Sequence, residues 1–346
     1  MSERTTPPPE KVEGARLCVE RSFDFVDQAL AEGPKSGPFL FVDYGAADGS
    51  ASIGLYERVA RAVSERGQPL SFVLNDVETN DNATLLQNGQ LATARYEAKV
   101  KVVEGSFWDP VAEPGSVSLA FSASAMHRLS TPGPVIANHI HANASLDEAV
   151  IKQYRDLALR DFRRLMAARG EELSVGGFLV AVNRARDHRD YYLGWTGKGA
   201  NIYDVLQRIW QKMHREGEVS LAEYRAANVQ GFYKDEDELK RVFKDASSEA
   251  YRKGLRLVDV RTETIRCPHQ ARFDRDGDVR AFGEGLGRTV EARARRTFER
   301  ALAEREDGGK GVVDDFFRRF QEVLMSKPHR YAMDYVQSYL LVRKVG

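Results

Sequence analysis

Cysteine is scarce in this chain, and neither sign of charge is in excess. The 346 residues include only two cysteines, Cys18 and Cys267, which cannot build a disulfide framework and do not have a zinc-binding spacing. Lysine and arginine together number 51, as do aspartate and glutamate, so no basic surplus favours a nucleic acid or a membrane surface as partner. These absences favour a small-molecule substrate and a reducing compartment.

Long hydrophobic runs are absent too. No stretch reaches the roughly 18 apolar residues that a membrane span needs, and residues 1–10 contain no apolar segment that would indicate a signal peptide. We therefore expect a soluble, cytoplasmic protein. A chain of this length can bury a sizeable core as one domain.

The most informative pattern that is present joins a strand, a turn and a helix. The apolar run Phe39–Val42 predicts a buried strand, residues 50–66 predict a helix, and Asp43, Gly45 and Gly49 lie between them. Such a unit opens nucleotide-binding α/β folds. The turn matches neither the G-x-G-x-x-G of dinucleotide sites nor the phosphate loop, which carries a lysine. Its acidic residue favours a cationic ligand such as S-adenosylmethionine (SAM).

Strands and helices alternate through the first half of the chain, which predicts a mainly parallel, Rossmann-like α/β sheet. Expected strands span 39–42, 70–76, 99–104, 116–122, 178–183, 255–264 and 336–342, and expected helices span 16–31, 50–66, 81–98 and 146–172. We expect a single domain over residues 1–346. Its core would comprise 36–183, 250–266 and 335–346, and a helical cap over the ligand site would comprise 184–249 and 270–334. Within the cap, Arg293–Arg296 is typical of a solvated helix face.

Polar or aromatic residues follow three successive predicted strands. Asp43 ends the first, Asp76 ends the second, and Ser106 and Phe107 follow the third. Open α/β sheets bind ligands at this edge. A carboxylate after the second strand can accept hydrogen bonds from two ribose hydroxyls, and a serine with an aromatic ring can receive adenine. Each residue alone could instead be a helix cap or a core side chain, but their order favours a SAM site.

Several motifs together resemble the SABATH family of SAM-dependent carboxyl methyltransferases, whose plant members methylate salicylate, benzoate and jasmonate. The matching segments are VDYGAADG at 42–49, LNDVETND at 74–81, EGSFW at 104–108 and SASAMHRLS at 122–130. A long helix from 154 followed by Gly176-Gly177 and a strand also corresponds. The resemblance covers most of the chain and implies a class I SAM-dependent methyltransferase sheet with a helical cap over the active site.

The resemblance implies a role for each residue of the SAM site. Asp43 and Gly45 would lie against the methionine end of the cofactor. Asp76 would hold the ribose, and Val77 would pack on the adenine.

Four further residues complete the implied cofactor site. Ser106 and Phe107 would finish the adenine pocket, and Ser122 would lie close to the cofactor. Arg21-Ser22 corresponds to an N-terminal element of the family, so Ser22 would also reach the cofactor.

Two departures from the family concern the substrate. Phe25 stands where many members have a glutamine that binds the substrate carboxylate, and Arg128 follows His127 where the family has a tryptophan. A guanidinium can pair with a carboxylate through two hydrogen bonds, so we expect Arg128 to anchor the acid. His127 could position the substrate or act as a base, and Trp195 in the cap could line the pocket that holds the acid. The family has a proline in the stretch that corresponds to residues 228–233, and this chain lacks it. We therefore predict no metal site from the resemblance.

The leading hypothesis is an O-methyltransferase that converts a small carboxylic acid to its methyl ester by in-line transfer from SAM. An N-methyltransferase or a phenol O-methyltransferase on the same fold is one alternative, because both usual carboxylate donors are replaced. A SAM-binding protein with an inactive acceptor site is another. Family members are often dimers, so a homodimer is among the expected states.

Overall fold

The computed structural model describes residues 9–198 and 200–346, and the expected absence of a signal peptide therefore falls largely on residues 1–8, outside the described part. Its strands are β1 (Phe39–Tyr44), β2 (Leu70–Asp76), β3 (Lys99–Glu104), β4 (Val117–Ala123), β5 (Leu173–Arg184), β6 (Leu193–Trp195), β7 (Ala200–Asn201), β8 (Leu255–Ile265) and β9 (Asp334–Lys344). The sheet order is β3-β2-β1-β4-β5-β9-β6-β7, with β8 also paired to β9. Strands β1 to β5 run parallel, whereas β9 is antiparallel to both β5 and β8.

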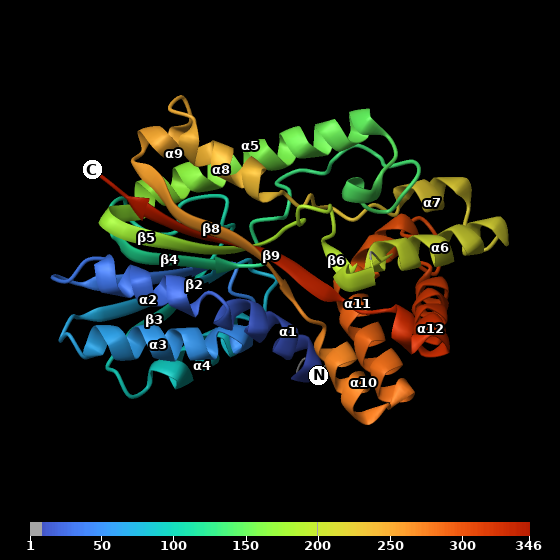
Figure 1. The fold of residues 1–346 in the computed structure, drawn as a ribbon, viewed down its shortest axis with the longest axis horizontal. Helices are drawn as coiled ribbons and strands as arrows, with labels where there is room; N and C mark the ends of the chain where they lie inside the picture. Colours follow the sequence, from blue (N-terminus) through green and yellow to red (C-terminus); the bar gives the residue numbers. More distant parts are fainter. Residues whose placement is uncertain (1–8, 199) are drawn as a thin grey trace.

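Helices cover both faces of this sheet (Figure 1). The first group is α1 (Pro9–Glu20), α2 (Phe23–Glu32), α3 (Ile53–Ser64) and α4 (Asn82–Thr93), and the second is α5 (Glu148–Glu172), α8 (Glu236–Lys244) and α9 (Glu249–Arg252). The central strands β1 and β4 are almost wholly buried, which explains their nearly continuous apolar sequences. The predicted mixture of a parallel sheet with flanking helices is confirmed.

The helices at the other end of the molecule form the cap (Figure 1). They are α6 (Ile202–Arg215), α7 (Leu221–Ala226), α10 (Pro268–Asp276), α11 (Val279–Ala301) and α12 (Lys310–Ser326). Trp210 of α6 packs its ring 5.0 Å from Phe298 of α11 and 5.6 Å from Phe316 of α12. These aromatic side chains belong to the same buried cluster as residues of α2, α3 and β9. The cap and the sheet therefore share one hydrophobic core.

Three details differ from the expected elements. The helix expected over 16–31 is two helices, because the chain turns at Arg21-Ser22 between α1 and α2. Gly176-Gly177 lies inside β5 rather than before it, since Leu173 already pairs with Val117 and the register shifts beside the glycines. Helix α8, expected in the cap, instead packs on β8 and α9 beside the sheet.

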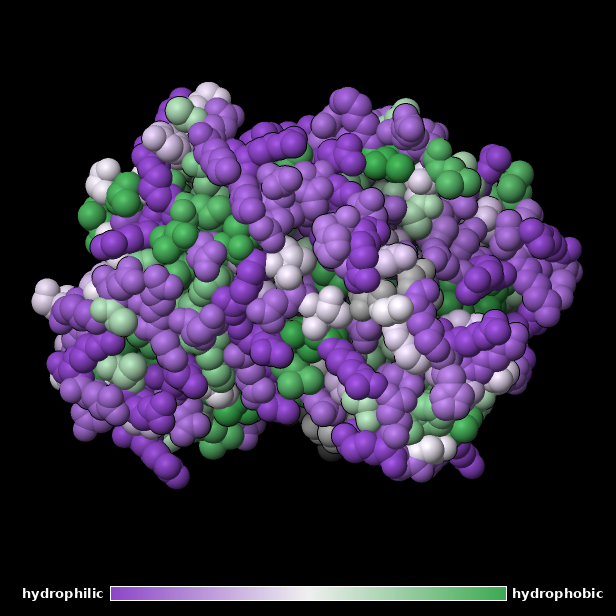
Figure 2. Space-filling view, viewed as in Figure 1, coloured by the Kyte–Doolittle hydropathy of each residue, from purple (hydrophilic) through white to green (hydrophobic). Residues whose placement is uncertain are grey.

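Figure 2 shows a mainly hydrophilic face on which apolar side chains form small, separate groups. Exposed large apolar residues such as Leu146 and Val175 are scattered along the sequence. Within residues 9–198 and 200–346, no helix has both the length and the apolar character needed to cross a membrane.

An ion pair between Arg169 and Glu172 is buried where α5 meets β5. Nε of Arg169 donates to Oε2 of Glu172 over 2.6 Å, and both side chains are almost fully buried. The other oxygen of Glu172 accepts the backbone N–H groups of Val111 and Ala112. Arg169 also donates to the carbonyl of Phe107 over 2.9 Å. The pair therefore fixes the loop that follows β3.

Replacing Glu172 by glutamine should leave the buried Arg169 without a compensating charge. We expect Glu172→Gln to lower the free energy of unfolding by about 3 kcal/mol, measured by urea denaturation. Its neighbour Glu171 is exposed and pairs with Lys253 at the surface, so Glu171→Gln should cost less than about 1 kcal/mol. Equal losses in the two variants would contradict a special role for the buried pair.

Candidate functional site

A cavity of about 500 Å³ lies at the carboxyl ends of β1, β2 and β4. Its walls also include residues of α1, of the loop after β3 and of α11. We call it the strand-end cavity. Among the residues predicted from sequence, those that line it are Asp43, Gly45, Asp76, Val77, Phe107 and Arg128. The topology brings them together because parallel strands present their carboxyl ends at one edge.

Asp43 is a buried carboxylate on the wall of the strand-end cavity. Its residue is 1% exposed, and the Tyr56 hydroxyl donates to its Oδ2 over 2.7 Å. Burial raises the pKa of Asp43 to about 7, although the Tyr56 hydrogen bond acts in the opposite direction and nearby Asp76 raises the pKa further. A buried carboxylate without a cationic partner favours a ligand that carries positive charge.

The turn after β1 passes very close to the loop after β4. Gly45 has φ +73°, and a Cβ placed there would lie 2.6 Å from Cβ of Ala125. The backbone N–H groups of Gly45 and Ala46 both donate to the carbonyl of Asn75, over 2.9 and 3.0 Å. Only glycine meets both demands without strain, and the turn is thereby held against β2.

Asp76 lies at the mouth of the same cavity. Its two oxygens accept the backbone N–H groups of Ala47 (2.7 Å) and Val77 (2.8 Å). Each carboxylate oxygen has a second lone pair, so both can still accept a hydroxyl of a ligand. Val77 is 44% exposed, which gives the rim an apolar surface.

Phe107 supplies an apolar wall of the cavity. Its ring is nearly buried and lies 5.0 Å from the ring of Trp108. Ser106 does not line the cavity, and its Oγ accepts the backbone N–H of Trp108 over 3.3 Å.

The predicted cofactor contacts of Ser22 and Ser122 stay predictions. Both residues are buried and neither lines the strand-end cavity. Ser22 donates to the carbonyl of Val19 over 2.6 Å, and Ser122 donates to the carbonyl of Tyr44 over 2.8 Å. Their hydroxyls support the cavity wall, because Val19 lines the cavity and Tyr44 precedes Gly45.

The three residues predicted to contact the acceptor do not lie together. Arg128 is exposed and lines the strand-end cavity. His127 does not line this cavity, and its ring centre lies 5.6 Å from that of Tyr233. Trp195 lies on β6, where the ammonium of Lys198 is 4.1 Å from its ring centre, and it does not line the cavity.

The His127 side chain is partly buried. Its Nδ1 is buried and has no hydrogen-bond partner. Burial holds the pKa of His127 well below its usual range, and the cations of Arg184, Arg128 and Lys234 lower it further.

Some residues near the cavity were missed or misjudged from sequence. Arg296 of α11 lines the cavity and is exposed, as expected, whereas Arg293 is half-buried with Nε and Nη1 enclosed. The expected solvated face of Arg293–Arg296 is therefore wrong for Arg293. The physical reason is that α11 packs over the cavity edge, which helical charge patterning does not reveal. Arg184 was also missed, although its place at the end of a buried strand is a signal. Phe25, at the position of the family's glutamine, is a core side chain.

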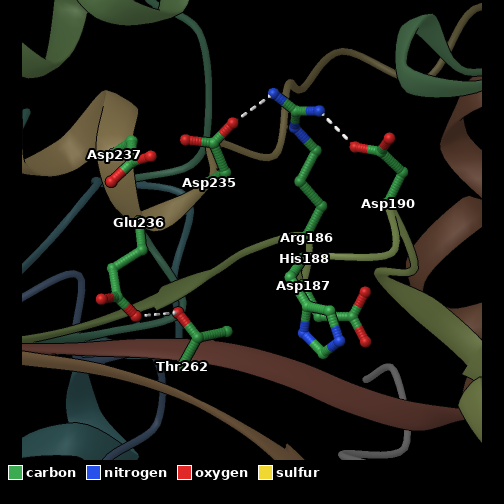
Figure 3. A pocket seen from close by; sticks show the side chains of 8 residues that line it. All are labelled: Arg186, Asp187, His188, Asp190, Asp235, Glu236, Asp237 and Thr262. Carbon is green, nitrogen blue, oxygen red and sulfur yellow. Dashed lines mark hydrogen bonds and ion pairs between the residues drawn. The ribbon is translucent and has the colours of Figure 1, made fainter.

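A second cavity, shown in Figure 3, contains mainly acidic side chains. Arg186 pairs there with Asp190 and Asp235, and the Thr262 hydroxyl donates to Glu236. These contacts already balance much of the charge. None of the residues predicted from sequence lines this cavity, and the strand-end cavity therefore remains the candidate site.

The raised pKa of Asp43 predicts a pH-dependent stability. The folded chain retains the Asp43 proton up to about pH 7, whereas the ordinary pKa is 3.8. The unfolded state then binds fewer protons across this range, so the contribution to stability is present at low pH and is lost as pH rises toward 7. In the wild type, we expect the free energy of unfolding to fall by about 3 kcal/mol between about pH 5 and about pH 8 because of Asp43. In Asp43→Asn this fall should be absent, as measured by urea unfolding. Asp237→Asn, at an exposed residue, should leave the wild-type pH profile, and a wild-type profile in Asp43→Asn would contradict the prediction.

Comparisons with known proteins identify the family. The sequence model of a family described as SAM-dependent carboxyl methyltransferase matches residues 31–345. A probable S-adenosylmethionine-dependent methyltransferase of Arabidopsis thaliana is 24% identical and covers 93% of this chain and 87% of its own length. A probable jasmonic acid carboxyl methyltransferase of Theobroma cacao is 22% identical over 70% of this chain and 65% of its own length.

A solved structure agrees at the level of the fold. A loganic acid methyltransferase with S-adenosylhomocysteine (SAH) superposes with a TM-score of 0.76 and covers 96% of this chain and 94% of its own, at 18% identity. Because the family match spans nearly the whole chain, this protein belongs to the SAM-dependent carboxyl methyltransferases of the SABATH family, and its cofactor is SAM.

Proposed function

We propose that the strand-end cavity holds SAM and that the chain methylates a small carboxylic acid bound between this cavity and the cap. The observation that carries the proposal is the convergence of Asp43, Asp76 and Phe107 on one cavity. Relatives named for jasmonic acid and anthranilate, and a structural neighbour named for loganic acid, support a small acid as acceptor.

The cavity residues fit the cofactor chemically. Asp43 would attract its ammonium group, because a buried carboxylate gains most from a nearby cation. Asp76 would accept hydrogen bonds from two ribose hydroxyls, and Phe107 with Val77 would enclose the adenine. The volume of about 500 Å³ is in the range of small-molecule sites.

The chemistry of the acceptor favours a carboxylate. SAM supplies a methyl group on a cationic sulfur, and a carboxylate oxygen can take it without losing a proton. A carboxylic acid is ionised at pH 7 because its reference pKa is near 4. A phenol would need a base, and His127, whose pKa is lowered well below its usual range, is a weak one. Arg128 at the cavity wall would orient the acid.

The ester assay separates this proposal from its alternatives. We expect labelled SAM and a panel of aromatic, terpenoid and dicarboxylic acids to give a base-labile methyl ester. Label that resists base would favour methylation of nitrogen or of a phenol. SAM binding without methyl transfer to any acceptor would favour an inactive acceptor site.

A charge change at Asp76 should weaken cofactor binding. We expect Asp76→Asn to reduce SAH affinity by about 2 kcal/mol, or roughly 30-fold, measured by titration calorimetry. Glu78→Asn is the matched control, because Glu78 is exposed close by and does not line the cavity. Similar losses in both variants would indicate a general charge effect and contradict a direct contact.

The cellular setting is part of the proposal. Cys18 and Cys267 are both free and buried, which supports the inference of a reducing compartment such as the cytoplasm. A homodimer and the absence of nucleic-acid and membrane partners stay predictions.

A further inference from the structure

Arg184 and Arg293 are half-buried arginines that have no acidic partner among the residues that the structure describes. Arg184 ends β5, and Arg293 lies on α11 of the cap. Nε of Arg184 and both Nε and Nη1 of Arg293 are buried and have no hydrogen-bond partner. Among residues 9–198 and 200–346, no carboxylate forms an ion pair with either guanidinium. We call these two residues the arginine pair.

The sheet register places Arg184 next to the strand-end cavity. Arg184 pairs with Gln337 of β9, and residues directly opposite each other in an antiparallel pair share one face of the sheet. The Gln337 side chain donates to Oγ of Ser124 over 3.3 Å, and Ser124 lines the cavity.

Arg293 approaches the same region from the cap. It precedes Arg296 by three residues on α11, so the two lie on neighbouring positions of one helix face, and Arg296 lines the strand-end cavity. Nη2 of Arg293 donates to the hydroxyl of Tyr335 over 3.4 Å, and Tyr335 lies two residues before Gln337 on β9. The arginine pair therefore adjoins the cavity from the sheet and from the cap.

The groups that act on both members of the arginine pair are uncharged. The groups that act on both guanidinium ions are Tyr203, Tyr335 and Cys18. Burial raises the pKa of each of these groups above its usual value, so none is anionic at pH 7. No anionic group among the described residues therefore balances the two positive charges of the pair.

Elsewhere this chain balances its buried cations. Arg169 is paired with Glu172, and Glu238 and Asp161 act on Lys234. An unpaired buried charge costs several kcal/mol. An anionic ligand would remove that cost, and a guanidinium is well shaped for a carboxylate.

Building on the proposed function, we propose that the acceptor is a dicarboxylic acid and that Arg184 and Arg293 bind the carboxylate that does not react. Two unbalanced cations match an acid with two negative charges. The reacting carboxylate needs a lone pair for the methyl group, and a carboxylate held by two guanidinium ions has its lone pairs engaged. Formation of the monoester removes one negative charge, so the product binds more weakly than the substrate and leaves.

Binding measurements test this proposal independently of catalysis. With SAH present, calorimetry would compare glutarate, adipate and phthalate with their monoamides. We expect at least one diacid to bind the wild-type chain about 100-fold more tightly than its monoamide. Arg184→Gln and Arg293→Gln should each remove most of this preference and leave SAH affinity unchanged. Arg288→Gln is the matched control, because Arg288 lies exposed on the same helix.

The stability of the ligand-free variants gives a second readout. Loss of an unpaired, partly buried charge should leave the Tm of Arg184→Gln equal to or above that of the wild type, whereas loss of a purely structural arginine would lower the Tm.

Three results would overturn the proposal. The first is equal affinity for diacids and their monoamides, and the second is no binding of any diacid. The third is an equal loss of affinity for the diacid and for its monoamide in the arginine variants, which would mean that the pair binds the reacting carboxylate. Diacid binding without ester formation would instead refute the proposed reaction and leave the anion site standing.

Discussion

The antiparallel strand β9 is the constraint on which the rest of this structure depends. It comes last in the chain, yet it lies between β5 and β8 and pairs with both along most of its length. Its first residues also pair with β6. The same strand therefore completes the sheet, joins the cap to it, and brings Tyr335 and Gln337 beside the strand-end cavity. Side chains of β9 pack in the same hydrophobic core as side chains of the cap and of the sheet. This shared packing fixes the position of the cap relative to the edge of the sheet.

Buried charge is distributed unevenly around the ligand site. Where charge supports the fold, it is paired, as between Arg169 and Glu172, which hold the loop that carries Phe107. Where charge faces the proposed ligands, it lacks an opposite partner. Asp43 is a buried acid, and Arg184 and Arg293 are half-buried cations whose Nε atoms are enclosed. This distribution of charge suits a cationic cofactor and an anionic acceptor. The cofactor would balance the charge of Asp43, and the acceptor would balance the charges of the two arginines.

Sequence patterns predicted the cofactor side far better than the acceptor side. Asp43, Gly45 and Asp76 each follow or end a buried strand, and a parallel sheet gathers such positions at one edge whatever else the chain does. The acceptor side depends on how the cap packs. His127 and Arg128 are adjacent in sequence, but one side chain lies near Tyr233 while the other lines the cavity. Charge patterning likewise assigned Arg293 to solvent, because it cannot show that α11 lies over the sheet edge.

The sequence alone determined the order of strands and helices, the glycine turn after β1 and the acidic residues beside it. These features depend on local hydrophobic period and on backbone conformations that neighbouring residues set. The tertiary structure decided that α8 and α9 cover the sheet and that Trp195 lies away from the strand-end cavity. It also brought Arg184 and Arg293, from distant parts of the chain, together. Long-range pairing by β9 and packing of the cap make those contacts, and no local pattern encodes them.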